Sequence, residues 1–359
     1  MSWLLAFAGF AILIILHEFG HFAVAKLVGM RVERFSLFFP PLIARKKVGE
    51  TEYAIGAVPL GGYVKISGMS PDEDLPEEVR TRAYHAQPPW KRVAVIAAGP
   101  AMNLVLALLL LFVFFAFIGG RTVSDRVDQV DPKLPAAGVL RPGDELVSVD
   151  GKRGDTIALS QAIAAHRCAV QPPRAGCRAE RPARVVVRRD GRTRAFQLTP
   201  VYDPEVERMR VGFNYAEGPR ETLGFGDAVD RSLNRFWFIT KQTVTLPARL
   251  LDAEKRKEIS GPVGSYEVTR QTIIEDAADA VGILAIISLS LAIVNLFPFL
   301  PLDGGHIFWA IVEKVRRRPV PFSVMERAGV VGFMLVIGLF LIGLSNDIDR
   351  LSGEGFGVR

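Results

Sequence analysis

The residues with the clearest chemical potential in this sequence form one short pattern, His17-Glu18-Phe19-Gly20-His21. In a helix, residues i and i+4 share a face, so the two imidazoles can bind one metal ion. The H-E-x-x-H pattern is a signature of zinc metalloproteases, in which the glutamate is the general base. The pattern lies in an apolar stretch, where an ionisable residue at mid-bilayer costs about 2.5–3.5 kcal/mol. A bound metal ion can offset this cost. The alternative is that hydrogen bonds to other helices offset it.

A catalytic zinc ion needs three protein ligands and one open coordination position. Between residues 280 and 312 the only carboxylate is Asp303, in the segment 295–306 (NLFPFLPLDGGH). The prolines and glycines of this segment predict a broken helix, which is tolerated at membrane depth only against protein or a water-filled cavity. We therefore expect Asp303 to be the third ligand. His306 could instead be the third ligand, or it could orient one of the ligands. Asp303 could also have a purely structural role at a helix kink.

Four apolar stretches are long enough to cross a bilayer, which takes about 20 helical residues. They cover about residues 3–28, 93–118, 281–312 and 328–344. The first has no basic N-terminal region and is too long for a signal peptide, so we expect a retained helix. Lys and Arg are concentrated between the first and second stretches and between the third and fourth, so the positive-inside rule makes these loops cytoplasmic. Both termini and the long segment between the second and third stretches then lie on the other side.

The composition supports a membrane protein with an extramembrane part. The chain has 359 residues, of which 49% are hydrophobic and 23% are charged, with a net charge of +6. These values exclude a disordered chain and a fibrous repeat. The basic excess is a topology signal and a surface for anionic lipid. No basic helix or aromatic-lined groove motif accompanies it, so nucleic acid is not an expected partner.

We expect four regions along the chain. They are a first membrane half at 1–120, a small β-rich external domain at 121–201, an amphipathic linker at 202–280 and a second membrane half at 281–359. Residues 31–66 alternate apolar and polar positions and contain Gly61-Gly62, which predicts short β-strands on the cytoplasmic side. An extended substrate could add to an edge of these strands. Asn103, in the second apolar stretch, either hydrogen-bonds a metal ligand or holds helices together.

Several of these motifs occur together and in the same order in one family. The matching segments are 17–21 (HEFGH), 61–69 (GGYVKISGM), 84–92 (YHAQPPWKR), 99–103 (GPAMN) and 295–306. On these motifs the chain resembles the site-2 protease family of intramembrane zinc metalloproteases, in its bacterial sigma-E protease branch. The resemblance implies Zn2+ bound by His17, His21 and Asp303, with Glu18 as the base and Asn295 near the substrate.

The external domain carries a second resemblance. Residues 127–152 are similar to a PDZ domain, and the chain has room for one such domain where enterobacterial relatives carry two. This domain could bind a peptide ligand, or it could act as a steric gate or spacer. Cys168 and Cys177 fall in the same domain, and in an oxidising compartment we expect them to form a disulfide.

The expected fold is therefore an α-helical polytopic membrane protein with four transmembrane helices, a membrane-associated β-hairpin region and one external PDZ-like domain. The resemblance implies a bacterial inner-membrane enzyme that cleaves single-span membrane proteins in or near their transmembrane segment. Anti-sigma factors or remnant signal peptides are the implied substrates. The alternative is a non-catalytic membrane-anchored PDZ scaffold, which would not need Glu18. A transporter is disfavoured because the spans contain no acidic chain towards the outer side.

Overall fold

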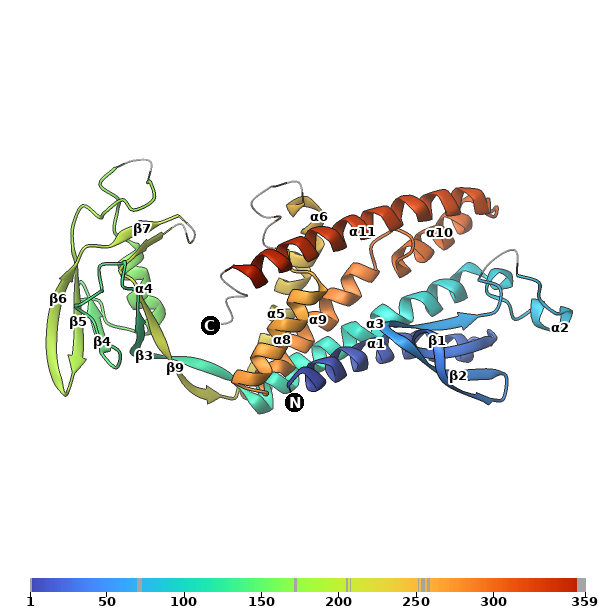
Figure 1. Ribbon diagram of the computed structural model, residues 1–359, viewed down its shortest axis with the longest axis horizontal. Coiled ribbons are helices and arrows are strands. Elements are labelled where there is room, and N and C mark those ends of the chain that lie inside the picture. Colours follow the sequence, from blue (N-terminus) through green and yellow to red (C-terminus); the bar gives the residue numbers. More distant parts are fainter. Residues whose placement is uncertain are drawn as a thin grey trace. The chain divides into compact units, whose positions relative to one another are not determined.

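The chain forms two compact units. The computed structural model describes residues 2–353, apart from 70–72, 171–172, 205, 207, 251, 253–255 and 257–258. One unit contains Met1–Ile118 and Thr222–Arg359 and is mostly helical, and the other contains Gly119–Glu221 and is rich in β-strands (Figure 1). We call them the helical unit and the β-rich unit.

Long apolar helices build the helical unit. Three described helices are long and apolar enough to cross a membrane: α1 (Ser2–Leu27), α3 (Pro89–Val113) with its π-helical end η2 (Phe114–Ile118), and α11 (Phe322–Ser352). Helix α3 packs against α1, α9 (Asp279–Asn295) and α10 (Asp303–Arg316). The shorter helices are α2 (Glu77–Arg80), η1 (Tyr84–Ala86), α5 (Phe225–Val244), α6 (Leu246–Arg249) and α8 (Pro262–Glu275).

The third apolar stretch, which we predicted over 281–312 with a break at its prolines and glycines, consists of two helices. Helix α9 ends at Asn295 and α10 begins at Asp303, and a loop with Pro298 and Pro301 separates them. Proline has no backbone N–H for the helical ladder, which explains the interruption. The prediction of four spanning helices is thus confirmed only in part, because α9 alone is a shorter apolar helix.

A folded hairpin packs against α1. Strands β1 (Val32–Val48) and β2 (Thr51–Ile66) are joined by a tight turn, and Val48 pairs with Thr51. Leu37 in the first part of β1 pairs with both Gly62 and Ile55, so this part of β1 lies between the two halves of β2. Among the residues that the structure describes, no further strand pairs with the outer side of the second half of β2.

The β-rich unit is a five-stranded sheet with one helix. The sheet order is β6-β5-β4-β3-β9, with β3 (Gly120–Val130), β4 (Glu145–Val149), β5 (Ala183–Arg189), β6 (Arg192–Leu198) and β9 (Phe213–Glu221). Helix α4 (Thr156–Ala164) and a small pair of strands, β7 (Val201–Asp203) and β8 (Arg208–Arg210), complete it. We predicted that the external domain ends at 201, but β9 pairs with β3, so this compact unit continues to Glu221.

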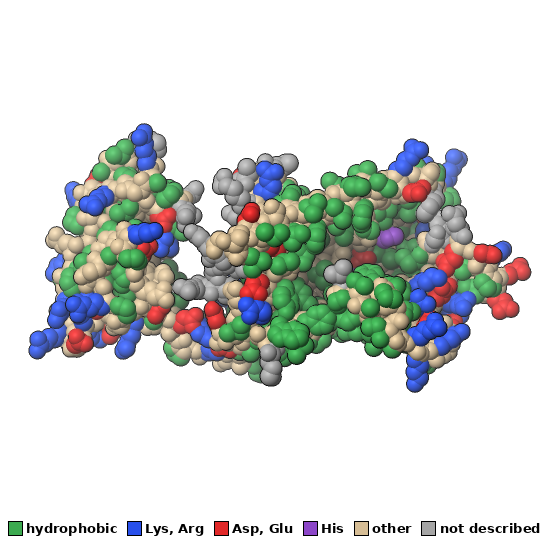
Figure 2. All heavy atoms as spheres, viewed as in Figure 1, with side chains coloured by type: hydrophobic (Ala, Val, Ile, Leu, Met, Phe, Trp, Pro, Cys, Tyr) green, Lys and Arg blue, Asp and Glu red, His purple; other side chains and the backbone are tan. Residues whose placement is uncertain are grey.

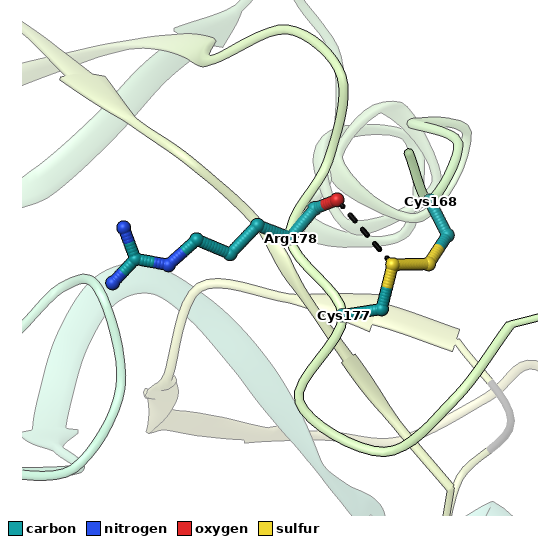
Figure 3. The surroundings of a disulfide bond; sticks show 3 residues. All are labelled: Cys168, Cys177 and Arg178. Atoms are coloured by element: carbon teal, nitrogen blue, oxygen red, sulfur yellow. Dashed lines mark hydrogen bonds between the residues drawn. A yellow bond between two sulfur atoms is a disulfide. The ribbon is translucent and has the colours of Figure 1, made fainter. Parts of the chain in front are cut away.

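The disulfide predicted between Cys168 and Cys177 is present in the β-rich unit (Figure 3). Their Cα atoms lie 5.9 Å apart, which is within the usual range for a disulfide. Cys168 is buried with Ala179 and Met209, and its backbone forms an isolated antiparallel β-bridge with Ala179. Both cysteines therefore pack in one cluster with Met209 of β8.

Candidate metal centre

Two separate parts of the helical unit bring three potential metal ligands together. His17 and His21 lie one turn apart on α1, and Asp303 is the first residue of α10. His17 Nε2 lies 3.3 Å from His21 Nε2 and 3.2 Å from Asp303 Oδ2, and His21 Nε2 lies 3.4 Å from the same oxygen. Both histidines are buried.

These distances fit a tetrahedral zinc ion. Zinc bonds of about 2.0–2.1 Å place two ligand atoms about 3.3–3.4 Å apart. Asp303 Oδ2 is also a buried oxygen without a hydrogen-bond partner among the described residues. A buried hydrogen-bond acceptor that faces other acceptors loses its hydration without gaining a hydrogen bond, which costs free energy. A cation bound between the acceptors offsets this cost.

A backbone contact with α3 fixes the orientation of His21. Its Nδ1 lies 2.9 Å from the carbonyl oxygen of Val95, and a carbonyl can only accept, so Nδ1 carries the proton. In the neutral ring, Nε2 then presents its lone pair to His17 and Asp303. A hydrogen bond of this kind to the non-ligating nitrogen is the usual way in which proteins orient a histidine ligand.

Two glycines allow this close approach of α1 and α3. A Cβ atom at Gly99 would overlap the His21 ring, and a Cβ atom at Gly20 would overlap the Ala98 carbonyl. The ring therefore occupies space that any other residue at position 99 would fill.

The loop between α9 and α10 positions Asp303. Cβ atoms at Gly304 and Gly305 would overlap the backbone of this loop, at Leu296 and Leu300 respectively. Only glycine therefore lets the loop fold against the first turn of α10. A carboxylate in the first turn also interacts favourably with the helix dipole.

A cavity of about 380 Å³ opens beside the three ligands. Figure 2 shows a hollow bordered by hydrophobic side chains in the helical unit, with a histidine visible inside it. The cavity is lined by residues of α1, β2, α3, α9 and α10 and of the loops after β2 and before α10: Ile14, His17, Glu18, His21, Gly61, Gly62, Tyr63, Val64, Ile66, Met69, Ile96, Leu291, Asn295, Pro301, Asp303 and His306. The cavity therefore leaves space for a water molecule beside the candidate ligands.

Glu18 lies against the outer side of β2. It lines the cavity together with Gly62 and Val64 of this strand. A Cβ atom at Gly62 would lie 2.9 Å from Glu18 Cγ and 3.0 Å from the Ser36 carbonyl oxygen. The glycine thus lets the strand approach the acid, and it brings a backbone edge next to the candidate ligands.

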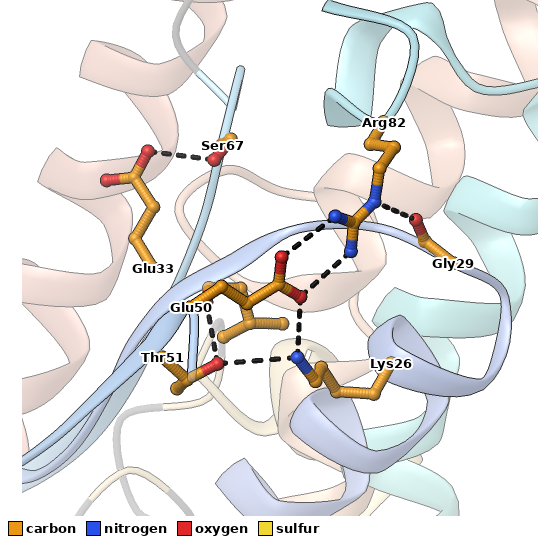
Figure 4. Close-up of polar contacts among 8 residues, drawn as sticks. Lys26, Gly29, Glu33, Glu50, Thr51, Ser67 and Arg82 are labelled. Atoms are coloured by element: carbon orange, nitrogen blue, oxygen red, sulfur yellow. Dashed lines mark hydrogen bonds and ion pairs between the residues drawn. The ribbon is translucent and has the colours of Figure 1, made fainter. Parts of the chain in front are cut away.

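Charged side chains tie the turn of the hairpin to α1 and to the loop before α3 (Figure 4). Glu50 accepts hydrogen bonds from Arg82 Nη1 and Nη2, both at 2.8 Å, and from Lys26 Nζ at 2.7 Å. The hydrogen bonds from Arg82 and Lys26 hold the pKa of Glu50 at about 2. The hairpin is therefore anchored at the end of α1, one turn and a half beyond His21.

Most of the residues singled out in the sequence meet at this cavity. Gly61, Gly62 and Asn295 line it, and so does His306, although the three-ligand cluster contains Asp303 instead of His306. Asn103 does not line it. It is fully buried, and its backbone carbonyl accepts a hydrogen bond from Ser288 of α9.

Sequence reasoning missed the contacts that orient the ligands. The Val95 carbonyl gives no signal in the sequence, because every residue has one. Gly99 does give a signal, since it lies in the GPAMN motif of an otherwise apolar helix. A glycine that interrupts a spanning helix indicates a close approach of another helix, and here that helix is α1.

Known proteins with similar sequences are zinc metalloproteases by name. The sequence model of the family described as Peptidase family M50 matches residues 5–339. A candidate zinc metalloprotease of Clostridium perfringens is 31% identical over 358 residues, which cover 97% of this chain and 98% of the relative. Relatives of the same description from Nostoc and Brucella suis are each 30% identical and cover 99% and 94% of this chain, and 98% and 92% of their own lengths.

The apolar helices and the matched family together define a membrane-embedded zinc metalloprotease. The chain belongs to peptidase family M50, the site-2 protease family. The family predicted from the motifs is thus confirmed, and so are the zinc metalloprotease activity and the Zn2+ cofactor.

Proposed function

We propose that this chain hydrolyses a peptide bond in or near the transmembrane segment of single-span membrane proteins. His17, His21 and Asp303 hold the zinc ion, and Glu18 is the general base. The observation that carries this proposal is the convergence of the three ligand atoms and Glu18 on one cavity within the apolar helical unit.

When bound, zinc supplies a Lewis acid for the scissile carbonyl and lowers the pKa of a nearby water. Glu18 accepts a proton from the attacking water at its carboxylate and delivers it to the leaving amine nitrogen. The carboxylate lies at the cavity beside β2, where Gly62 leaves room for it. Val95 keeps the proton of His21 on Nδ1, so that Nε2 stays available as a ligand.

The substrate binds as an extended strand on the outer side of β2. A peptide bond inside a helix is hydrogen-bonded and shielded, so the transmembrane segment must unwind first. The backbone of Gly62–Ile66 can then pair with the unwound segment by strand addition. The side chain of Asn295, at the end of α9, lines the same cavity and can hold a substrate carbonyl.

We infer that α9 and α10 together form the third of four membrane crossings. The basic loops after α1 and α10 then face the cytoplasm, and both termini and the β-rich unit are periplasmic in a bacterial inner membrane. The β-rich unit is PDZ-like. It contains two cavities of about 160 and 350 Å³, and Ser160 of α4 and Tyr215 of β9 line both of them. A groove between a helix and an edge strand suits a peptide that adds to the sheet.

Glu18→Gln tests the proposal. We expect the variant to retain about one zinc ion per chain but to cleave a model single-span substrate at least about 10²–10⁴-fold more slowly, because only the proton acceptor is lost. Glu78→Gln, on the exposed helix α2, is the matched control and should cleave at the wild-type rate. Cleavage by purified Glu18→Gln at the wild-type rate would contradict the role of Glu18.

The same variant can identify the substrates. Glu18→Gln should trap uncleaved single-span proteins in native membranes, and anti-sigma factors and remnant signal peptides are the two classes to distinguish. If the trapped chains are soluble proteins, a transmembrane substrate is wrong.

A further inference from the structure

We propose that Arg92 and Glu313 form a positioning pair that holds α10, and with it Asp303, against α3 in the geometry that the zinc ion needs. This inference rests on the proposed function, which assigns Asp303 as a zinc ligand. Neither residue lines the cavity.

The pair is close and largely withdrawn from solvent. Arg92 Nη2 lies 2.5 Å from Glu313 Oε2, and the two side chains are 14% and 16% exposed. The other carboxylate oxygen of Glu313 accepts a hydrogen bond from the Val320 backbone at 3.3 Å, and the Arg92 guanidinium lies 5.9 Å from the Tyr84 ring centroid. Removing one partner would leave a poorly solvated charge, so the pair resists separation.

On α3, the arginine shares a face with the contacts that hold His21. Arg92, Val95 and Gly99 follow the spacing i, i+3, i+7, which places them on one side of the helix. Val95 accepts the hydrogen bond from His21, and Gly99 makes room for its ring. One face of α3 therefore supports the α1 half of the metal site and, through Arg92, reaches α10.

On α10, the glutamate shares a face with the ligand. Asp303, Ile307, Ala310 and Glu313 follow the spacing i, i+4, i+7, i+10. Ile307 packs against the buried cluster that contains Val95 and Ile96. Glu313 lies about 15 Å along the helix from Asp303. Helix α3 therefore contacts this face of α10 at two places, near Ile307 and at Glu313.

The ion pair matters because α10 is short and is flanked by loops. It has only 14 residues, and its orientation depends on its packing against α3. In the part of the chain that the structure describes, Arg92–Glu313 is the one ion pair that joins these two helices. Without it, α10 can tilt about its N-terminal loop, and such a tilt changes the distance from Asp303 to the histidines.

The experiment compares zinc affinity in Arg92→Gln, Glu313→Gln and the exchanged double variant Arg92→Glu/Glu313→Arg. Apo protein is titrated with zinc against a chromophoric chelator, and cobalt substitution reports the ligand geometry from its visible absorption. Arg188→Gln is the matched control, because it also removes an arginine paired with a glutamate, but one in the β-rich unit. Circular dichroism and gel filtration confirm that each variant is folded.

We expect each single variant to bind zinc about 10–100-fold more weakly and to give an altered cobalt spectrum, the range found when groups that orient metal ligands are removed. Their kcat should fall while KM for the substrate changes less than about 3-fold, because the cavity lining is intact. The exchanged variant should regain most of the lost affinity, and Arg188→Gln should bind zinc like the wild type.

Wild-type affinity in both single variants would overturn the positioning role. Equal losses in the single and exchanged variants would also overturn it, since the charge pair would then not be the cause. A wild-type protein that binds no zinc at all would instead contradict the proposed function, so the two failures are distinguishable.

Discussion

Asp144 in the β-rich unit and Asp303 in the helical unit differ in how their buried carboxylate oxygens are bonded. In the β-rich unit, Asp144 is 1% exposed, and both of its oxygens are bonded: Arg189 donates to them at 2.7 and 2.6 Å, and the Arg141 backbone N–H donates at 2.9 Å. In the helical unit, His17 Nδ1 and Asp303 Oδ2 are buried without a hydrogen-bond partner among the described residues.

This difference distinguishes a structural charge from a functional one. A fully paired buried carboxylate stabilises one arrangement of strands, and it has no capacity left for a ligand. A buried carboxylate and imidazoles whose acceptor atoms converge are unfavourable until a cation binds them. Asp303 Oδ2 and the imidazole nitrogens beside it are therefore the atoms of the helical unit that fit a bound cation.

The largest expected effect in this comparison is that of His21→Ala. It should remove both zinc binding and measurable cleavage, because the remaining two ligands cannot hold a catalytic ion. Metal analysis and a cleavage assay on the purified protein test this expectation. Full zinc occupancy in His21→Ala would show that the unsatisfied atoms do not mark a metal site.

Asp144→Ala should have the next largest effect, now on stability. Removing one partner of a buried ion pair costs about 3–5 kcal/mol, so hydrogen exchange in β4 and β5 of the full chain should accelerate while zinc binding is retained. The double variant Asp144→Ala/Arg189→Leu should be less destabilised, since no buried charge remains.

Arg188→Gln is the matched control for Asp144→Ala. Its pair with Glu145 is exposed at the arginine, and surface pairs contribute about 0–1 kcal/mol. If Asp144→Ala exchanges no faster than Arg188→Gln, full pairing is not what stabilises this unit.

Gly99→Ala should weaken zinc binding by about 10–100-fold, because the added methyl group displaces the His21 ring from its position. Gly120→Ala, in β3 of the β-rich unit, is the control, since a Cβ there would meet nothing within 4 Å. Both variants are tested by zinc competition. Equal affinities would mean that the ring tolerates a shift, and that α3 does not define the site.

The smallest expected effect is a loss of stability of the β-rich unit at low pH. Burial opposes ionisation of Asp144, but the bonds from Arg189 and Arg141 outweigh it, so the pKa of Asp144 lies below its usual value. Its stabilising contribution is then complete above the unfolded pKa of about 3.9. It is lost as the pH falls through the lower folded value.

Hydrogen exchange of β4 and β5 in the full chain, measured between about pH 3 and pH 6, tests this dependence after correction for the intrinsic exchange rate. Protection should fall only below about pH 4 in the wild type. Asp144→Asn should show no such fall, and an identical fall in this variant would assign the effect to another group.

Local patterns in the sequence predict the parts of the site that depend on local structure. The spacing of His17 and His21 alone predicts a two-imidazole face, because helix geometry fixes it. The prolines before Asp303 likewise predict the break between α9 and α10. The turn between β5 and β6 has positive φ at Asp190 and at Gly191, and an Asp-Gly dipeptide is typical of such a hairpin turn.

Contacts between distant segments could not be predicted in this way. The hydrogen bond from His21 to Val95 joins residues 74 positions apart and uses a backbone carbonyl, so no side-chain type signals it. The pairing of β9 with β3 also joins distant segments, and the polar sequence of β9 resembles a linker. This is why the β-rich unit extends 20 residues beyond the predicted boundary of 201 and ends at Glu221.

The most direct test of a zinc ion held between α1 and α10 is metal analysis of purified Asp303→Ala beside wild type and Glu18→Gln. We expect about one zinc ion per chain in wild type and in Glu18→Gln, and almost none in Asp303→Ala, although all three proteins are folded. Wild-type zinc content in Asp303→Ala would contradict the account, because the ion would then be bound without the second half of the helical unit.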